Sequence, residues 1–358
     1  MRTVPRRILI VRPSAFGDVC RTVPLLWSLR KSFPEAVIDW VVEDVWAPAV
    51  AEHPAIDRVV SFPKRTFRSI WRSPRVALQA ARWLWALRAR KYDLVIDAQG
   101  LARSGLMSWI TGAPVRVVGD SCREFSWLGA NRRVSSPRGS HVVDSMLQLA
   151  AAVGANPAAD MRLAVPSADV EWWNGERKWR GIDGPLVVFA TANGWAGKRW
   201  IPTRWQQLLQ IIAPDLSRHG IHDVVWIGAP GEEDQVAWNQ GCESLPTPLR
   251  SHNLSGLTSV GGTMAVVKSA SLVVALDSAP AHLAIGLGVP VVALYGATDP
   301  NTDGPYQAQE WCAHGGRGFK LDRHDYRSAT KGGEMMARIS VEEVATLIRK
   351  RLLLGAES

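Results

Sequence analysis

Two turns of small residues, one in each half of the chain, place the strongest constraint on its fold. The first interrupts residues 8–30 (ILIVRPSAFGDVCRTVPLLWSLR) and the second interrupts residues 272–300 (LVVALDSAPAHLAIGLGVPVVALYGATDP). In each segment a β-branched run ends at the turn and an apolar helical pattern follows. Such a turn exposes backbone amides and a helix N-terminus, the usual anion-binding position of α/β proteins. Two of them predict two Rossmann-like halves with a ligand held between them.

Short apolar runs alternate with helical patterns along the whole chain, which predicts parallel sheets with crossover helices. The predicted strands are residues 8–11, 37–42, 59–62, 94–97, 115–118, 186–190, 224–228, 272–276 and 291–295. The clearest helical patterns are residues 24–31, 104–111 and 340–354, the last opening on a capping box from Ser340 to Glu343. Pro and Gly gather between residues 156 and 185, around EWWNGERKWR, which predicts a linker containing one short helix.

Composition limits the class of protein. A length of 358 residues favours two domains, and 47% hydrophobic with 21% charged residues is typical of a globular protein. No apolar run approaches the roughly 18 residues of a membrane span, and the run at 8–11 is too short for a signal peptide. We therefore expect a cytoplasmic protein. Cys20, Cys122, Cys242 and Cys312 lie far apart, which favours free thiols over a zinc or redox site.

The net charge of +9 calls for an anionic partner: a nucleotide, a nucleic acid or an acidic membrane surface. Residues 64–91 hold nine Lys or Arg and no acid, interleaved with Phe67, Trp71, Trp83 and Trp85. This mixture is typical of a segment at a membrane interface. A solvated helix face with buried tryptophans explains it equally well.

The first turn offers one candidate catalytic group. Gly17 permits a tight turn, and Asp18 stands where the helix is expected to begin. The carboxylate of Asp18 either caps the helix or acts as a general base.

The second half offers candidate phosphate-binding groups. Amides around Ser278 at the second turn suit a diphosphate, and His282 follows one helical turn later as either a ligand contact or a core residue. Lys198 follows a strand and the small residues of ATANGWAG, where a lysine neutralises phosphate. Glu232 follows another strand and suits a ribose diol or a helix start. The sequence holds no D-x-D pair, so Lys, Arg and backbone amides would neutralise a diphosphate without metal.

Together these segments resemble glycosyltransferase family 9, the lipopolysaccharide heptosyltransferases. The similar segments occur in family order from residue 8 to about residue 344: IVRPSAFGDVCRTVPLLWSLR, YDLVIDAQGLARSGLMSWITGAPVRVVG, CREFSW, NRRV, HVVD, GWAGKRWIP, IGAPGEE, LSGLTS, LDSAPAHLA and YGATDP. The sequence DSAPAH departs from the Asp-Thr-Gly-Leu-Ser-His of one branch of the family. Cys312 alone stands where many relatives carry several cysteines.

The resemblance implies an α/β fold of GT-B architecture, with two Rossmann-like domains facing a central cleft. Residues 1–165 would form the acceptor-binding domain, 166–184 a linker and 185–339 the ADP-sugar-binding domain. Residues 340–358 would form a C-terminal helix that packs back on the N-terminal domain.

The resemblance also implies roles for individual residues. Asp18 would take the acceptor proton, and Lys198 would stabilise the leaving phosphate. The implied donor-binding residues are Asn193, Gly194, Lys198, Glu232, Leu257, Thr258, Asp277, Ser278, Ala279 and His282. The implied acceptor-binding residues are Ser14, Gly17, Arg65, Arg68, Gln99, Arg123 and His141.

The implied reaction is inverting transfer of heptose from ADP-L-glycero-D-manno-heptose to the Kdo or inner-core region of lipopolysaccharide, without metal or cofactor. It would take place on the cytoplasmic face of the inner membrane, with an anionic lipid surface and no nucleic acid as partner. Three alternatives stay open. The chain could heptosylate a protein such as an autotransporter, bind a nucleotide sugar or nucleic acid without catalysis, or use a mannose donor.

Overall fold

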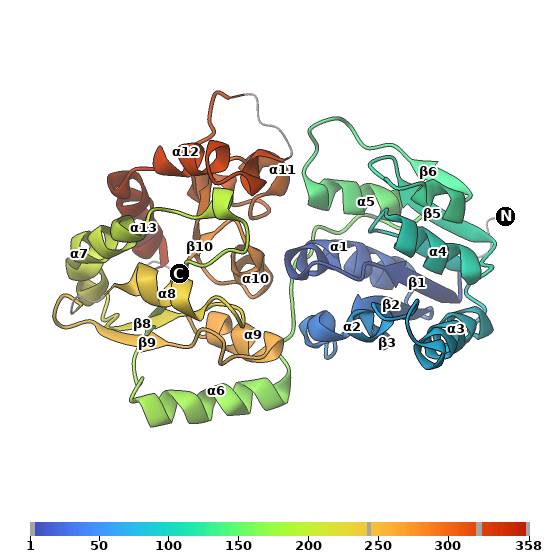
Figure 1. Cartoon of the computed structure of the whole chain (residues 1–358), viewed down its shortest axis with the longest axis horizontal. Coiled ribbons are helices and arrows are strands. Elements are labelled where there is room, and N and C mark those ends of the chain that lie inside the picture. The colour runs from blue at the N-terminus through green and yellow to red at the C-terminus, as the bar shows by residue number, and fades with distance from the viewer. Residues whose placement is uncertain (1–3, 242–244, 320–323, 356–358) are drawn as a thin grey trace. The chain divides into compact units, whose positions relative to one another are not determined.

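The computed structural model describes residues 4–241, 245–319 and 324–355, and the chain divides into two compact units (Figure 1). The N-terminal unit is Met1–Ala164 and the C-terminal unit is Val165–Ser358. Each unit is built on one six-stranded parallel sheet with helices or 3₁₀ turns between successive strands. The prediction of two Rossmann-like halves is confirmed.

The sheet of the N-terminal unit has the strand order β3-β2-β1-β4-β5-β6. Its strands are β1 (Arg7–Val11), β2 (Val37–Glu43), β3 (Arg58–Phe62), β4 (Leu94–Asp97), β5 (Val115–Gly119) and β6 (Arg132–Val134). Its helices are α1 (Phe16–Ser32), α2 (Lys64–Phe67), α3 (Pro74–Ala89), α4 (Ala102–Ile110) and α5 (Val142–Ala152), with 3₁₀ turns η1 (Asp44–Ala49) and η2 (Ser126–Gly129). Five of these strands were predicted to within one residue at each end.

The sheet of the C-terminal unit has the order β12-β11-β10-β7-β8-β9. Its strands are β7 (Leu186–Ala190), β8 (Asp223–Trp226), β9 (Arg250–Asn253), β10 (Leu272–Leu276), β11 (Val291–Tyr295) and β12 (Cys312–His314). Its helices are α6 (Ser167–Arg180), α7 (Pro202–Arg218), α8 (Glu233–Gln240), α9 (Val260–Lys268), α10 (Ala279–Gly286), α11 (Pro300–Asp303), α12 (Lys331–Ala337) and α13 (Val341–Gly355), with 3₁₀ turns η3 (Ala196–Lys198), η4 (Gln309–Trp311) and η5 (Asp325–Arg327).

The two sheets share one topology. Numbered within its own unit, each sheet runs in the doubly wound order 3-2-1-4-5-6. In each unit the order reverses beside the first strand, between β1 and β4 and between β7 and β10. In each unit, the loops that follow the two central strands therefore lie together at the carboxyl ends of the strands, where α/β proteins bind ligands. In the N-terminal unit these loops are residues 12–18 and 98–101, and in the C-terminal unit they are residues 191–199 and 277–278.

The central strands are buried on both faces, as their continuous apolar sequences require. Several tryptophans belong to the core of the C-terminal unit: Trp205 packs edge-to-face on Trp200, with ring centroids 4.8 Å apart, and Phe189 contacts both Trp205 and Trp226. Helix α13 packs on α7 and on β11 of the same unit.

Two helix predictions need correction or extension. The helix predicted from residue 24 begins at Phe16 and continues through Pro24, so the proline does not mark its start. Most of the predicted linker is the 14-residue helix α6, which packs on α9. There Trp173 is buried, and its Nε1 donates to Ser269 Oγ at 2.7 Å.

Candidate functional site: two half-sites at the strand ends

The turn after β1 places Asp18 inside the first turn of α1. Ala15 is the N-cap residue, and Asp18 is the third helical residue, whose carboxylate accepts a hydrogen bond from Ala15 N at 3.3 Å. The alternative that Asp18 is the N-cap is therefore wrong. Gly17 is the second residue of the helix, so it does not form the tight turn that was predicted for it. The carboxylate nevertheless accepts a backbone N–H, as an N-terminal acidic residue should.

Two arginines hold the Asp18 carboxylate. Arg12 Nη2 lies 3.1 Å from Asp18 Oδ2, and Arg21 Nη2 donates to Asp18 Oδ1. Burial alone would raise the pKa of Asp18, but the charges of Arg12 and Arg21 hold that pKa well below its usual range. Asp18 is thus ionised at any physiological pH. Sequence reasoning missed both arginines, although the i, i+3 spacing of Asp18 and Arg21 was a usable signal.

The loop after β4 joins this turn. Ser14 N donates to Gln99 Oε1 at 3.2 Å, so the structure brings together two of the predicted acceptor residues. Asp97 ends β4 and is buried, and its Oδ1 accepts from the amides of Gln99 at 3.0 Å and Gly100 at 2.9 Å. Ser104 Oγ donates to the other carboxylate oxygen at 3.0 Å. Burial raises the pKa of Asp97 to about 6, against these hydrogen bonds.

The other predicted acceptor residues lie on different elements. Arg65 and Arg68 are exposed on and just after α2, and Arg123 is exposed in the turn before η2. His141 is buried and is the N-cap of α5, where its Nδ1 accepts from Val143 N at 3.1 Å. His141 therefore has a helix-capping role in the fold.

In the C-terminal unit, three predicted donor residues meet at the edge shared by β7 and β10. Lys198 Nζ lies 2.6 Å from Asp277 Oδ2, and Asn193 Nδ2 donates to Asp277 O at 3.0 Å. Thr298, in the loop after β11, donates its hydroxyl to the same Asp277 carboxylate. A cation is thereby fixed beside the end of β10.

Helix α10 begins directly after Asp277. Ser278 is its N-cap residue, Ala279 its first residue and Pro280 its second. The Ser278 hydroxyl donates back to Leu276 O at 3.1 Å, and His282 is buried in the helix. Pro280 has no N–H, and Ala281 N donates to Ser278 O at 3.2 Å, so the amides of Ser278 and Ala279 and the helix dipole add to the positive potential near Lys198.

The predicted ribose and adenine residues lie on two adjoining segments. Glu232 is the N-cap residue of α8, and its Oε2 accepts from Ala229 N at 2.8 Å. Leu257 is 62% exposed, whereas Thr258 shares a 2.8 Å hydroxyl hydrogen bond with Thr263. The preceding Gly256 has φ +71°, and a side chain there would meet Glu233, so the two segments are in close contact. Gly194 is exposed beside Asn193.

An aromatic and cationic cluster around Lys198 was not predicted. Lys198 Nζ lies 4.8 Å from the Tyr326 ring centroid, and Trp195 packs edge-to-face on Tyr326 at 5.4 Å. Arg327 lies over both rings. Tyr326 is 128 residues from Lys198 and belongs to no motif, so the sequence carried no signal for this contact.

Glycines bring the two segments of this cluster together. A Cβ at Gly197 would lie 2.5 Å from the carbonyl oxygens of both Tyr326 and Ser328. A Cβ at Gly332 would lie 2.6 Å from the Gly197 backbone. The turn that carries Lys198 is thus packed directly on residues 325–332.

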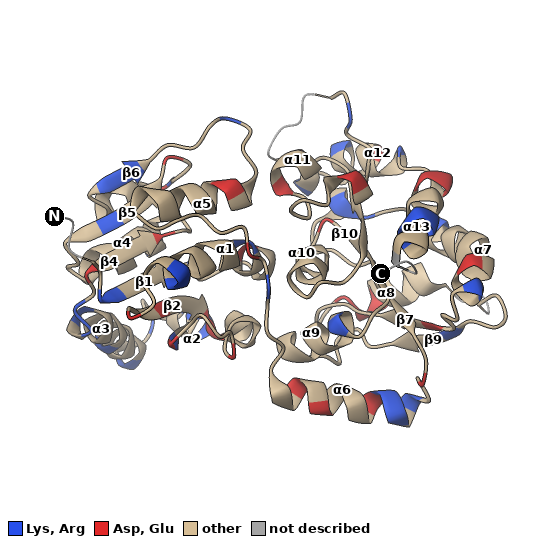
Figure 2. Cartoon of the chain, turned by 180° about the vertical axis from the view of Figure 1, so that it is seen from behind, with Lys and Arg blue, Asp and Glu red and all other residues tan. Residues whose placement is uncertain are grey.

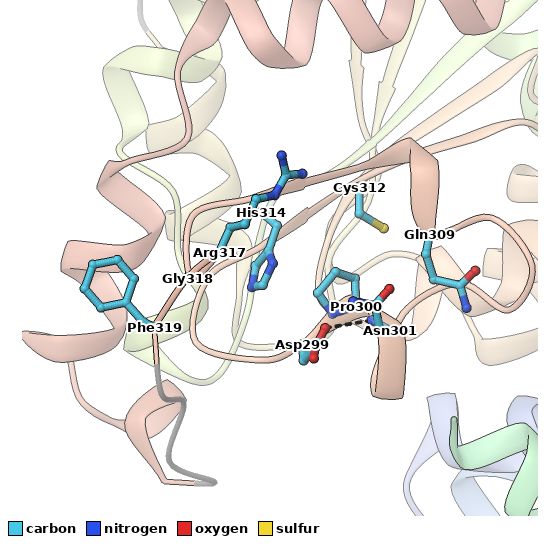
Figure 3. A pocket seen from close by; sticks show the side chains of 10 residues that line it. Asp299, Pro300, Asn301, Gln309, Cys312, His314, Arg317, Gly318 and Phe319 are labelled. Carbon is cyan, nitrogen blue, oxygen red and sulfur yellow. Dashed lines mark hydrogen bonds between the residues drawn. The ribbon is translucent and has the colours of Figure 1, made fainter. Parts of the chain in front are cut away.

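A polar cavity of about 240 Å³ lies at the carboxyl end of β12 (Figure 3). Its lining includes Asp299, Asn301, Gln309, Cys312 and His314, none of which was predicted as a site residue. Burial, with a smaller contribution from the Asp277 charge, raises the pKa of Cys312 well above its usual range, so the thiol is neutral.

Cys20, Cys122 and Cys312 are free, and Cys242 lies outside the described residues. Within residues 4–241, 245–319 and 324–355, no group of three His, Cys, Asp or Glu side chains could hold a metal ion. Over the same residues, no helix has both the length and the apolar character needed to cross a membrane.

Comparison with known proteins identifies the family. The model of glycosyltransferase family 9 (heptosyltransferase) matches residues 81–330. The chain belongs to this family. It is a glycosyltransferase, and its two Rossmann-like units are those of a GT-B enzyme.

Relatives of this family 9 glycosyltransferase extend the match over most of the chain. Lipopolysaccharide heptosyltransferase 1 of Pseudomonas aeruginosa is 31% identical over 304 residues, covering 84% of this chain and 81% of the relative. Lipopolysaccharide heptosyltransferase 1 of Escherichia coli K12 is 28% identical over 306 residues, covering 84% of this chain and 91% of the relative. The crystal structure of a family 9 glycosyltransferase from Veillonella parvula superposes with a TM-score of 0.81, at 22% identity and 98% coverage of both chains. The structure of E. coli heptosyltransferase WaaC with ADP superposes with a TM-score of 0.71, at 25% identity, covering 96% of this chain and 99% of that one.

Proposed function

We propose that this family 9 glycosyltransferase transfers heptose from ADP-L-glycero-D-manno-heptose to the Kdo or inner-core region of lipopolysaccharide, with inversion and without metal. The observation that carries the proposal is the Lys198–Asp277 pair beside the start of α10, where a lysine and the N-terminus of a helix suit a diphosphate. Among relatives of known structure, WaaC has been solved with ADP and with ADP-2-deoxy-2-fluoro heptose, which supports an ADP-sugar as donor. The curated relatives are lipopolysaccharide heptosyltransferases, which supports the acceptor.

In the proposed reaction, the C-terminal unit binds the donor and the N-terminal unit binds the acceptor. Lys198 and the α10 amides neutralise the diphosphate, while Glu232 binds ribose and Leu257 and Thr258 flank the adenine. Asn193, Gly194, Ser278, Ala279 and His282 complete the donor site.

The proposed chemistry is a single displacement. The acceptor oxygen forms a bond to the anomeric carbon as the bond from that carbon to the β-phosphate oxygen breaks. ADP leaves with both electrons of that bond, and Lys198 stabilises the charge that develops on it. Asp18 receives the proton of the acceptor hydroxyl.

The arginines beside Asp18 make it a weak base, and this fixes when the proton moves. A hydroxyl gives up its proton to such a carboxylate only once bond formation to the anomeric carbon has made the hydroxyl strongly acidic. Proton transfer is therefore late in the proposed mechanism, and Arg12 and Arg21 mainly hold the carboxylate in place. Ser14 and Gln99 orient the acceptor together with Arg65, Arg68, Arg123 and His141.

The test is an assay of ADP release from ADP-heptose in EDTA, with Kdo–lipid A as acceptor. Acceptor-dependent release with inverted anomeric configuration, determined by NMR, is expected. Asp18→Asn should lower kcat by at least roughly a hundredfold with ADP binding retained. Asp44→Asn, an exposed aspartate after β2, is the control and should leave the rate unchanged. Near-normal turnover of the Asp18 variant would remove Asp18 as base.

Acceptor identity is tested by parallel reactions. Activity only on heptosylated core would narrow the acceptor to the inner core beyond Kdo, whereas activity only on an autotransporter polypeptide would replace the proposed acceptor. Activity only with ADP-mannose would replace the donor sugar. We further propose that the enzyme works at the cytoplasmic face of the inner membrane, in keeping with a lipid-linked acceptor.

A further inference from the structure

The basic segment of residues 64–91 divides its aromatic side chains between the core and the surface. Phe67 and Trp83 pack on Phe62, with ring centroids 5.7 and 5.3 Å from it, and Trp83 Nε1 donates to Ser61 O at 2.8 Å. Trp71 and Trp85 are exposed instead. The interpretation as a solvated helix face with buried tryptophans therefore fits Trp83 but not Trp71 or Trp85, whose exposure needs an explanation of its own.

Helix α3 presents a single mixed stripe to solvent. Arg75, Leu78, Arg82 and Trp85 are all exposed and follow one another at helical spacing. Trp85 is 70% exposed. A surface helix normally places large apolar residues inward, so an indole and a leucine between arginines indicate contact with a surface that is itself both apolar and anionic.

The neighbouring helix continues the apolar surface. Helix α4 packs beside α3, and Arg88 Nη1 of α3 donates to Ile110 O at the end of α4, at 3.3 Å. Leu106 and Trp109 of α4 lie three residues apart and are both exposed, Trp109 to 56%. The exposed apolar groups of the two helices thus belong to adjoining elements.

A third element adjoins α4 and adds two more apolar residues. A Cβ at Gly129 of η2 would lie 2.0 Å from Gly105 O of α4, so the two backbones are in direct contact. Phe125, just before η2, and Leu128 within it are exposed. We call the exposed residues of these three elements the docking face: Leu78, Trp85, Leu106, Trp109, Phe125 and Leu128.

The charges around the docking face are mostly positive. Residues 64–91 contain nine cations and no acid, and positions coloured blue for Lys or Arg lie along α3 in Figure 2. Arg103, Arg123 and Arg133 belong to or flank α4 and η2. Glu124 accepts from Ala102 N at 3.2 Å and so is directed at the start of α4. Two of the nine cations, Lys64 and Arg90, pair with the buried acids Glu43 and Asp39, and the other seven carry the positive charge of the segment. The face therefore complements a negatively charged partner.

We propose that the docking face binds the surface of an anionic phospholipid bilayer. Indoles take up the headgroup level of a bilayer, and arginines pair with lipid phosphates, which accounts for both kinds of side chain on one face. A face of Leu and Phe alone would fit a protein partner equally well; the alternation with arginine favours lipid. This inference concerns where the enzyme is held and does not depend on the proposed reaction.

The test is flotation of the full chain with vesicles of phosphatidylethanolamine and phosphatidylglycerol, compared with vesicles of phosphatidylcholine alone. Binding only to the anionic vesicles, and weaker binding at high salt, is expected. The double variant Trp85→Ser/Trp109→Ser should lower the partition coefficient roughly tenfold or more, and Arg75→Gln/Arg82→Gln by a similar factor.

Matched controls come from the C-terminal unit. Trp179 is 77% exposed on α6, and Lys178 and Lys350 are exposed lysines. Trp179→Ser and Lys178→Gln/Lys350→Gln should bind vesicles like the unmodified chain. An unchanged thermal midpoint and ADP affinity would show that each variant is folded.

Two results would overturn the proposal. One is equal flotation of the docking-face variants and the controls. The other is that the unmodified chain does not float with vesicles but forms a concentration-dependent dimer, which the Trp85/Trp109 substitutions abolish. The docking face would then bind a second copy of the chain. Transfer to an acceptor in detergent micelles is measured separately, so a failure of lipid binding is distinguished from a failure of the proposed reaction.

Discussion

Replacing Asp97 by asparagine should make the stability of the N-terminal unit less sensitive to pH. Asp97 is buried at the end of β4, and burial raises its pKa from 3.8 to about 6. The folded unit therefore holds this proton more tightly than the unfolded chain does. The difference between the two pKa values corresponds to about 3 kcal/mol of free energy of unfolding. The folded unit loses this stability as the pH rises from about 4 to about 6.

Asparagine avoids this loss because it carries no charge. Its Oδ1 can accept from the amides of Gln99 and Gly100, as the carboxylate does, and its Nδ2 can donate to Ser104 Oγ. Relative to the unmodified chain, Asp97→Asn should therefore gain about 3 kcal/mol between pH 4 and pH 7. The gain should be complete by about pH 7 and absent below about pH 4.

The assay is urea unfolding at a series of pH values, followed by hydrogen-exchange labelling of peptides from β1 and β4, so that only the N-terminal unit is observed. Asp120→Asn is the control. A hydrogen bond from Ser135 lowers the pKa of this exposed carboxyl, so removing the charge of Asp120 should lower the stability as the pH rises, the opposite of the effect expected for Asp97→Asn. The reasoning would be refuted if the stability gained by Asp97→Asn over the unmodified chain did not change with pH, or fell as the pH rose. The hydrogen bonds to Asp97 would then outweigh its burial.

Three further results follow from the C-terminal unit. Lys198→Ala removes the cation beside Asp277 and should lower kcat, measured as ADP release, by roughly a hundredfold or more. A change confined to KM would contradict a role of Lys198 in stabilising the leaving group. Tyr326→Leu removes a cation–π contact worth about 0.5–1 kcal/mol and should weaken ADP binding in calorimetry by roughly two- to fivefold, whereas Tyr326→Phe should match the unmodified enzyme. Equal effects of the two Tyr326 variants would speak against ring contact as the cause. Trp205→Ala should destabilise the unit by about 3–5 kcal/mol in calorimetric unfolding, since its indole is fully buried; a loss below about 1 kcal/mol would mean that the core closes over the cavity.

The sequence was sufficient for the central strands and for edge strand β3, and insufficient at the other three sheet edges, β6, β9 and β12. Strands such as β4, β7 and β10 are buried on both faces, so they appear as continuous apolar runs. The edge strands β6 and β9 read RRV and RSHN and are partly exposed, so no apolar run marks them. Edge strand β12 has only three residues.

The candidate site shows a similar division. Asp18 and Lys198 were predicted because each follows a strand and a turn, and Asp277 was implied by the family resemblance. That Lys198 meets Asp277 depends on the pairing of β7 with β10, which strand alternation alone does not determine. Arg12 and Tyr326 were missed because they act on the predicted residues through tertiary contacts, whereas the i, i+3 spacing of Asp18 and Arg21 was a local signal that was not used.

The close approach of Gly197 to residues 325–332 has a consequence for the evolution and engineering of this enzyme. Gly197 and Gly332 must stay small together, because a side chain at either position would separate the Lys198 turn from the segment that carries Tyr326. The two segments are therefore expected to be inherited as a pair. A chimera that takes residues 324–337 from another family member should function only when the 194–199 turn comes from the same parent.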